Sequence, residues 1–272
     1  MLLLLNVRQG RKAIYKNTVS SNLNYMPGTI KEIHIFNNGH QLVDFATRKW
    51  TELAGAGMKT KGFFSVALSG GKTPVALYNR LSGEKALPWP ETHVFMVDER
   101  FVPYESDENN YHMINRTLLS HVDIATKNVH PILTSELSPK AAAERYEQDL
   151  AAYCRTVGAR FPRFDLILLG IGEDGHTASL FPGTASLKET RCWAVSVCPP
   201  GPSKRARITL TFPVINNAEN IIFMVEGEKK AGIMKEVIQD ESNSLPAAMV
   251  RPLRGKIIFL LDERAGCLLS KK

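Results

Sequence analysis

Apolar residues along the chain follow two spacings, and together these predict an alternation of strands and helices. Runs with the length and composition of strands stand at 32–36, 63–68, 93–97, 166–169, 208–210, 221–225 and 257–261. Apolar residues at three- and four-residue spacing predict helices within 42–53, 74–81, 111–118, 142–150 and 231–238. Because helices separate the strands, we expect parallel crossovers and an α/β fold. Its core is an open, mainly parallel, Rossmann-like sheet covered by helices on both faces.

The alternation continues through the chain without a linker-like or low-complexity stretch. We therefore expect a single α/β domain over residues 28–272 and an amino-terminal extension, residues 1–27, outside the fold. The run of four leucines after Met1 is too short for a secretory signal, and no other run approaches the ~20 apolar residues of a membrane span. These observations predict a cytoplasmic protein with no membrane partner.

Charge and cysteine content narrow the kind of partner. The 34 basic and 27 acidic residues give a net charge of +7, which favours an anionic partner. The basic residues are scattered, and no recognition-helix, zinc-finger or aromatic-platform pattern indicates nucleic acid. The four cysteines form no C-x-x-C pair and no zinc-ligand spacing. We expect a small anionic ligand, reduced thiols and no metal site.

The most informative stretch follows the strand predicted at 166–169. There a glycine-rich turn displays Asp174 and His176, and its glycines, Gly172 among them, allow a ligand to approach the backbone. A carboxylate two residues before an imidazole, at the carboxyl end of a buried strand, is typical of a general base with its orienting partner. Two other interpretations stay open: a capping aspartate with a structural histidine, or two metal ligands that lack a third.

The same stretch matches the dinucleotide fingerprint G-x-G-x-x-G at 170–175, with Glu189 near the offset of its acidic partner. The fingerprint also needs a helix of several turns after the glycines. Pro182 and Gly183 interrupt that helix almost where it would start. Polar residues also stand where small ones should pack the helix on the sheet. These features argue against a nicotinamide site.

A second glycine turn, Ser69-Gly70-Gly71-Lys72-Thr73, follows the strand predicted at 63–68. Its glycines let backbone amides face a ligand. The helix predicted to begin here, with Thr73 as its cap, adds its positive end. The turn is not a Walker A loop, because Val66 stands where that motif has its first glycine. These five residues are candidates for binding an anion; the alternative is an ordinary strand-to-helix turn.

Two charged segments complete the set of candidates. Asp98, Glu99 and Arg100 follow the third predicted strand. Arg100 suits a phosphate or carboxylate, while a neighbouring acid holds the arginine or binds substrate hydroxyls. Lys204 and Arg207 lie behind a proline-rich loop and are candidates for a mobile basic lip over the site. The alternative for both segments is a solvated surface. In a parallel sheet, all of these groups gather at the carboxyl ends of the strands.

Together these stretches resemble the 6-phosphogluconolactonase family. The specific segment is Gly-His-Thr-Ala-Ser-Leu-Phe-Pro at 175–182. One departure is Asn109, where the family usually has serine. It puts a local turn contact in question and does not affect the chemistry. The matching segments run in family order between about residues 30 and 265: Leu68 to Pro74, Val97 to Pro103 with Asn110 and Tyr111, Gly170 to Pro182, Arg207 to Thr211, and Leu245 to Ala248.

The resemblance implies an enzyme that hydrolyses 6-phospho-D-glucono-1,5-lactone to 6-phosphogluconate without a cofactor, the second step of the oxidative pentose phosphate pathway. Histidine has a suitable pKa to take a proton from water near neutral pH, so our hypothesis makes His176 the general base and Asp174 its orienting partner. We assign the substrate phosphate to the turn at 69–73, to Arg100 and to the cations at 204–207. We expect a monomer or a weak homo-oligomer.

Two rivals share part of this pattern. Glucosamine-6-phosphate deaminases have the glycine turn, but they typically carry Asp-Glu-Tyr at the position of residues 98–100 and Ile-Ala-Phe-Asn-Glu at that of 177–181. Non-catalytic sugar-phosphate sensor domains of transcription regulators carry an attached pair of DNA-binding helices. Residues 1–30 are too short and too weakly patterned for such a pair. These differences favour the lactonase.

Overall fold

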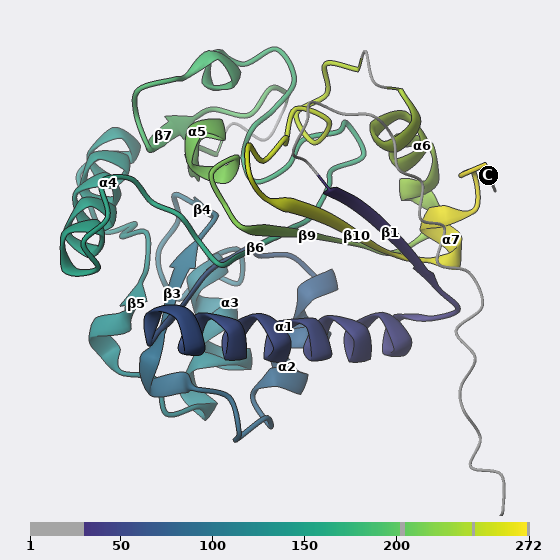
Figure 1. Cartoon of the computed structure of the whole chain (residues 1–272). Helices are drawn as coiled ribbons and strands as arrows, with labels where there is room; N and C mark the ends of the chain where they lie inside the picture. The colour runs from purple at the N-terminus through teal and green to yellow at the C-terminus, as the bar shows by residue number, and fades with distance from the viewer. Residues whose placement is uncertain (1–29, 202–204, 241–242, 271–272) are drawn as a thin grey trace, which may run out of the picture.

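The computed structural model describes residues 30–201, 205–240 and 243–270. The predicted extension at 1–27 and the candidate Lys204 lie outside the described residues. Within them, strands and helices alternate as the apolar pattern predicts (Figure 1). No helix in these ranges combines the length and hydropathy needed to span a bilayer.

The centre of the fold is a seven-stranded sheet in which every neighbouring pair is parallel. Its strand order is β1-β10-β9-β6-β2-β3-β5. The inner strands are apolar on both faces and almost fully buried, as expected for a parallel sheet covered on both sides. The strands are β1 (Ile30–Phe36), β2 (Phe64–Leu68), β3 (Thr92–Met96), β5 (Val129–His130), β6 (Leu166–Leu169), β9 (Asn220–Val225) and β10 (Lys256–Asp262).

Helices cover both faces of this sheet, which confirms the predicted α/β class. In Figure 1, α1 and α2 run along one side of the sheet and α5 and α6 lie on the other. The α-helices are α1 (Gly39–Lys61), α2 (Thr73–Leu81), α3 (Asn110–Thr117), α4 (Pro139–Thr156), α5 (Phe212–Ile215), α6 (Ala231–Gln239) and α7 (Glu263–Gly266). Short 3₁₀ turns lie at Trp89–Glu91, Leu119–His121, Thr126–Asn128, Ala185–Lys188 and Glu228–Lys230.

Local sequence explains where the longest helix begins and ends. The Asn38 side chain accepts the backbone N–H of Gln41 at 3.1 Å, which satisfies one free donor in the first turn of α1. At the other end Gly62 has a φ of 77°, and its N–H donates to the Met58 carbonyl at 3.1 Å. Leu42, Ala46 and Trp50 form the predicted apolar stripe and are buried.

A separate antiparallel sheet, of order β4-β8-β7, stands beside the large one. Its strands are β4 (Asp98–Arg100), β8 (Arg207–Leu210) and β7 (Ala194–Val197). The strand expected at 208–210 therefore forms, but outside the parallel sheet. The physical reason lies at Val97, whose N–H donates to the Leu68 carbonyl while its own carbonyl accepts the N–H of Leu210. The chain thus passes directly from β3 into β4 and carries residues 98–100 into the small sheet.

The order of the large sheet places a switch point between β6 and β2. The strand that follows β2 in the chain, β3, lies on one side of this pair, whereas β9 lies on the other. Loops that leave the two central strands therefore diverge and open a crevice above their carboxyl ends. Those two loops carry both glycine turns singled out in the sequence.

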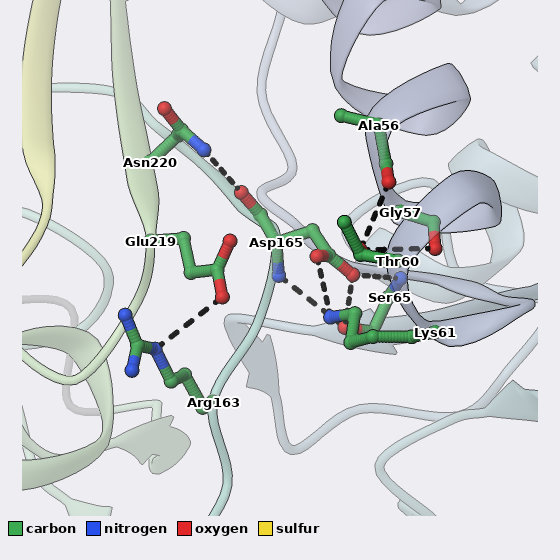
Figure 2. A network of polar contacts seen from close by, with 9 residues as sticks. All are labelled: Ala56, Gly57, Thr60, Lys61, Ser65, Arg163, Asp165, Glu219 and Asn220. Carbon is green, nitrogen blue, oxygen red and sulfur yellow. Dashed lines mark hydrogen bonds and ion pairs between the residues drawn. The ribbon is translucent and has the colours of Figure 1, made fainter.

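The opposite end of the sheet is locked by a buried aspartate (Figure 2). The Asp165 carboxylate, 4% exposed, accepts the backbone N–H and the hydroxyl of Ser65 at 2.8 and 2.9 Å. It also pairs with Lys61 Nζ at 2.5 Å, and its carbonyl accepts from Asn220 Nδ2 at 2.9 Å. One residue thus joins the end of α1 to β2, β6 and β9. The network fixes the central strands without entering the crevice.

Candidate active site

A cavity of about 290 Å³ occupies the crevice at the switch point. Nine of the site residues expected from the sequence line it: Ser69, Gly70, Gly71, Lys72, Thr73, Arg100, Gly172, His176 and Arg207. Asp174 does not line the cavity, but it contacts His176. The other lining residues are Pro74, Asp98, Asn110, Gly170, Ile171, Thr177, Ala178, Met224, Val225, Glu226 and Lys230.

The imidazole of His176 is held by the carboxylate two residues before it. Its Nδ1 lies 2.5 Å from Asp174 Oδ1, and the same oxygen accepts the His176 backbone N–H at 3.1 Å. An ionised carboxylate can only accept, so in the neutral imidazole this contact places the ring proton on Nδ1 and leaves a lone pair on Nε2. Burial opposes ionisation of Asp174, but the hydrogen bonds and charge of His176 outweigh it and lower the pKa of the carboxyl. The arrangement suits an imidazole that accepts a proton.

Glycine at position 172 is what allows this pair to form. A Cβ there would lie 2.1 Å from His176 Nδ1 and 2.5 Å from Asp174 Oδ1. The glycine thus makes room for the ring and the carboxylate. Residues 170–183 form turns and no helix. The helix that a dinucleotide fingerprint requires is therefore absent from this segment, in agreement with the argument from Pro182.

The glycine turn after β2 is built to expose backbone amides. The Ser69 hydroxyl donates to the Leu168 carbonyl at 2.8 Å, which ties the turn to the end of β6. Gly71 has a φ of 102°, which favours glycine. Helix α2 begins at Thr73, with Lys72 at the cap position making no side-chain hydrogen bond. The prediction of Thr73 as the cap is wrong, and the first amides of α2 gain no side-chain partner there.

Arg100 is held beside the cavity by the start of α3. Its Nη1 donates to the Asn110 side-chain oxygen at 2.7 Å and to the Glu108 carbonyl at 3.0 Å. Asn110 Nδ2 in turn donates to the Asp98 carbonyl at 2.9 Å. The Nε of Arg100 is buried and has no partner among the described residues. A buried donor of this kind is suited to an anionic ligand.

Glu99 has a different role from the one expected for it. Its fully buried carboxylate accepts the backbone N–H groups of Arg100, Asn110 and Tyr111 at 2.7–2.8 Å. The carboxylate thus anchors the amino end of α3. These three hydrogen bonds are to backbone amides, and none of them involves the guanidinium of Arg100. Burial raises the pKa of Glu99 to about 7, and the three amide hydrogen bonds only partly offset that rise.

Arg207 stands opposite Arg100 on the neighbouring strand of the small sheet. The two are partners in the β4–β8 register, and both line the cavity. The Arg207 Nε is also buried without a partner in the described chain, and burial lowers the pKa of this guanidinium. Like charges placed opposite each other on adjacent strands repel. A bound anion would relieve that repulsion.

Other titratable groups in the described residues do not form a metal centre. No group of three or more His, Cys, Asp or Glu side chains there could hold a metal ion. The interpretation of Asp174 and His176 as metal ligands therefore gains no third ligand within these ranges. The four cysteines are unpaired.

Comparison with known proteins identifies the family of this site. The model of the family "Glucosamine-6-phosphate isomerases/6-phosphogluconolactonase" matches residues 37–259. The chain belongs to this family. A 6-phosphogluconolactonase of Synechocystis is 40% identical over 209 residues, which are 76% of this chain and 85% of the relative. One of Rattus norvegicus is 38% identical over 217 residues, 77% and 82% of the two chains.

Solved structures of the family share the fold. The crystal structure of 6-phosphogluconolactonase from Thermotoga maritima superposes with a TM-score of 0.75 at 32% identity. The match covers 85% of this chain and 99% of that one.

The departure from the family pattern at Asn109 has a simple structural resolution. Asn109 occupies the cap position of α3, and its side-chain oxygen accepts the N–H of His112 at 2.8 Å. Serine and asparagine both serve well at this position. The local turn contact is thus present, and the neighbouring Asn110 keeps its contact with Arg100.

Sequence reasoning missed three side chains that line the cavity as possible ligand contacts: Asn110, Glu226 and Lys230. Asn110 enters the sequence argument only as part of the family motif, whereas Asp98 is one of the two acids expected to hold the arginine or to bind substrate hydroxyls. Glu226 and Lys230 follow β9, so the rule that ligands bind beyond strand ends pointed to them as well. Burial and the nearby Asp262 raise the pKa of Glu226. Arg205, by contrast, is paired with Glu108 and does not line the cavity.

Proposed function

We propose that this chain hydrolyses 6-phospho-D-glucono-1,5-lactone to 6-phosphogluconate in the oxidative pentose phosphate pathway. The observation that carries the proposal is the pairing of two kinds of group in one cavity. A carboxylate-held imidazole lines it together with two adjacent guanidiniums. Such a site can deprotonate water near one end of a substrate while it binds an anionic group at the other. The curated relatives described above are named for this activity.

The chemical step follows from the state of the imidazole. Nε2 of His176 takes a proton from water as the water oxygen bonds to the lactone carbonyl carbon. The tetrahedral intermediate then expels the ring oxygen, which takes a proton from the imidazolium and becomes the C5 hydroxyl. Asp174 holds the ring and stabilises its positive charge. A positioned base of this kind contributes about 10²–10⁴-fold.

The phosphate is assigned to the cationic side of the cavity. Arg100 and Arg207 present two guanidiniums, which bind phosphate oxygens in forked geometry. Lys72 and the free amides at the start of α2 extend this surface. Binding energy from the phosphate, which does not react, places the carbonyl against the base. The reaction consumes only water and the lactone.

The closest rival activity is deamination of glucosamine 6-phosphate, which the family description also includes. Release of ammonia from glucosamine 6-phosphate distinguishes the two. An enzyme that releases ammonia and leaves the lactone untouched would contradict the proposal.

We also infer the setting in which the enzyme works. Strands from residues 30–36 and 256–262 are neighbours in one sheet, which supports a single domain over 28–272. We expect a monomer or a weak homo-oligomer. A cytoplasmic location suits a substrate whose charge prevents passage through a bilayer. Sedimentation of the purified protein measures the oligomeric state.

The deciding assay generates the lactone with a glucose-6-phosphate dehydrogenase and follows 6-phosphogluconate with its dehydrogenase. The parent protein should accelerate the coupled signal. His176→Ala should lower kcat by about 10²–10⁴-fold, because the base is lost. Its affinity for 6-phosphogluconate should change little, because the cations remain. Turnover of the variant within threefold of the parent would contradict the assignment of His176.

A further inference from the structure

One aromatic ring contacts both halves of the proposed machinery. The Phe181 ring lies with its centroid 4.6 Å from that of His176, tilted by 38°. The guanidinium carbon of Arg207 lies 5.4 Å from the same centroid, within the range of a cation–π contact. Phe181 is only 4% exposed and does not line the cavity. Any influence it has on a ligand must therefore pass through its two neighbours.

The segment that carries this ring is locked to the small sheet. Ser179, which is fully buried, donates its hydroxyl to Asp98 Oδ2 at 2.5 Å. Its backbone N–H donates to Thr209 Oγ1 at 3.2 Å, and Asp98 and Thr209 are themselves partners across β4 and β8. The catalytic loop is thus attached to the two strands that carry the paired arginines.

The same segment is also fixed on the side of the histidine. The Thr177 hydroxyl donates to the Gly170 carbonyl at 2.8 Å, and the Leu180 N–H donates to the Thr177 carbonyl at 2.9 Å. The turn between them holds Ala178 at a φ of 52°, which is uncommon for a residue with a Cβ. A strained turn persists only where its surroundings determine it. Residues 177–181 therefore form a rigid connection from the end of β6 to the small sheet.

We propose that Phe181 is a positioning residue that sets the imidazole of His176 and the guanidinium of Arg207 relative to each other. The ring contacts both groups, and the Ser179 lock determines where the ring sits. The proposal rests on the function proposed above, since it makes the base and the phosphate-binding cation a single geometric unit. An ordinary core phenylalanine would only fill volume.

The first test replaces the ring but keeps much of its volume. Phe181→Leu should lower kcat/KM by about 10- to 100-fold, because displacements of an ångström at the reacting groups have effects of this size. The matched control is Phe212→Leu, which removes a similarly buried ring at the start of α5 that does not line the cavity. The control should stay within about threefold of the parent in kcat/KM. Thermal melting of both variants measures their folding.

Double-mutant cycles then separate positioning from packing. In a His176→Ala background, Phe181→Leu should cause no further loss of kcat. In an Arg207→Gln background, it should cause no further rise in the Kd for inorganic phosphate, measured by calorimetry. Both results mean that the ring acts through the deleted neighbour, whereas independent effects add.

Each outcome decides the question. Equal losses in the Phe181 and Phe212 variants, or additive cycles, would overturn the proposal and leave the ring as packing. A parent protein that does not turn over the lactone would contradict the proposed function instead. In that case the phosphate cycle, which needs no turnover, still decides whether the ring positions Arg207.

Discussion

At the scale of single residues, the site depends on places where a side chain is missing. A Cβ at Gly70 would lie 1.8 Å from the Asn110 side-chain oxygen, and one at Gly172 would meet the imidazole of His176. Both glycines were predicted to shape turns and admit a ligand. Their close packing against polar side chains shows a second reason for glycine, which the sequence pattern does not reveal because the partner of Gly70 lies 40 positions away.

The residue-scale prediction concerns Arg100. Arg100→Ala should raise KM for the lactone by about 10- to 100-fold and change kcat less, because it removes a charge-assisted contact to the remote phosphate. Steady-state kinetics in the coupled assay measure both constants. Arg205→Ala is a matched control, since Arg205 is a nearby cation paired with Glu108 and outside the cavity lining. An Arg100→Ala enzyme with the KM of the control would rule out the phosphate role.

At the scale of elements, three charged residues after β3 form a short strand and the anchor of a helix. The sequence shows a charged run and predicts a strand end. It does not show that β4 pairs with β8, because antiparallel pairing depends on a segment more than 100 residues later in the chain. The two-residue β5 was missed because a strand of that length has no periodicity to detect. Glu99 then became an anchor for α3 because tertiary packing brought three amides to its carboxylate.

The element-scale prediction uses the pKa of Glu99. Its folded pKa of about 7 lies above the ordinary 4.5, so the folded state binds the proton more tightly than the unfolded state. The stability that this group contributes is therefore present below pH 4.5 and is lost as the pH rises to 7. Glu99→Gln removes this titration. The free energy of unfolding of the variant minus that of the parent should therefore rise by up to about 3 kcal/mol as the pH increases from 4.5 to 7.

Chemical denaturation of both proteins at several pH values measures that difference. Asp107→Asn, at an exposed position in the loop before α3, is the control and should follow the parent. A constant difference between Glu99→Gln and the parent across this range would show that Glu99 does not titrate there.

At the scale of the whole molecule, the two ends of the sheet have separate tasks. The cavity lies at the carboxyl ends of the central strands, and the Asp165 network holds these strands at their other end (Figure 2). A buried carboxylate with three polar contacts is costly to remove, because Lys61 and Ser65 lose their common partner. Variants at the Asp165 end should therefore lose stability, whereas variants at the cavity end should lose activity.

The whole-molecule prediction is that Asp165→Ala lowers the free energy of unfolding by about 3–5 kcal/mol. KM at a temperature where the variant is folded should stay close to that of the parent. Glu219→Ala breaks a half-exposed pair with Arg163 whose closest atoms are 3.5 Å apart, and it should cost less than about 1 kcal/mol. Urea denaturation measures the free energy of unfolding of both variants. Equal losses would show that the buried network contributes no more stability than a half-exposed ion pair.

The sequence by itself determined the α/β class, the main strands and helices, and the loops that carry the chemistry. It could do so because apolar periodicity and glycine turns are local, and because parallel strands bring their carboxyl ends to one edge. Only the tertiary structure decided that 98–100 and 207–210 form their own sheet, that Glu99 anchors α3, and that Phe181 touches both His176 and Arg207. Those features depend on contacts between distant segments, whose geometry is set by packing and leaves no periodic trace in the chain.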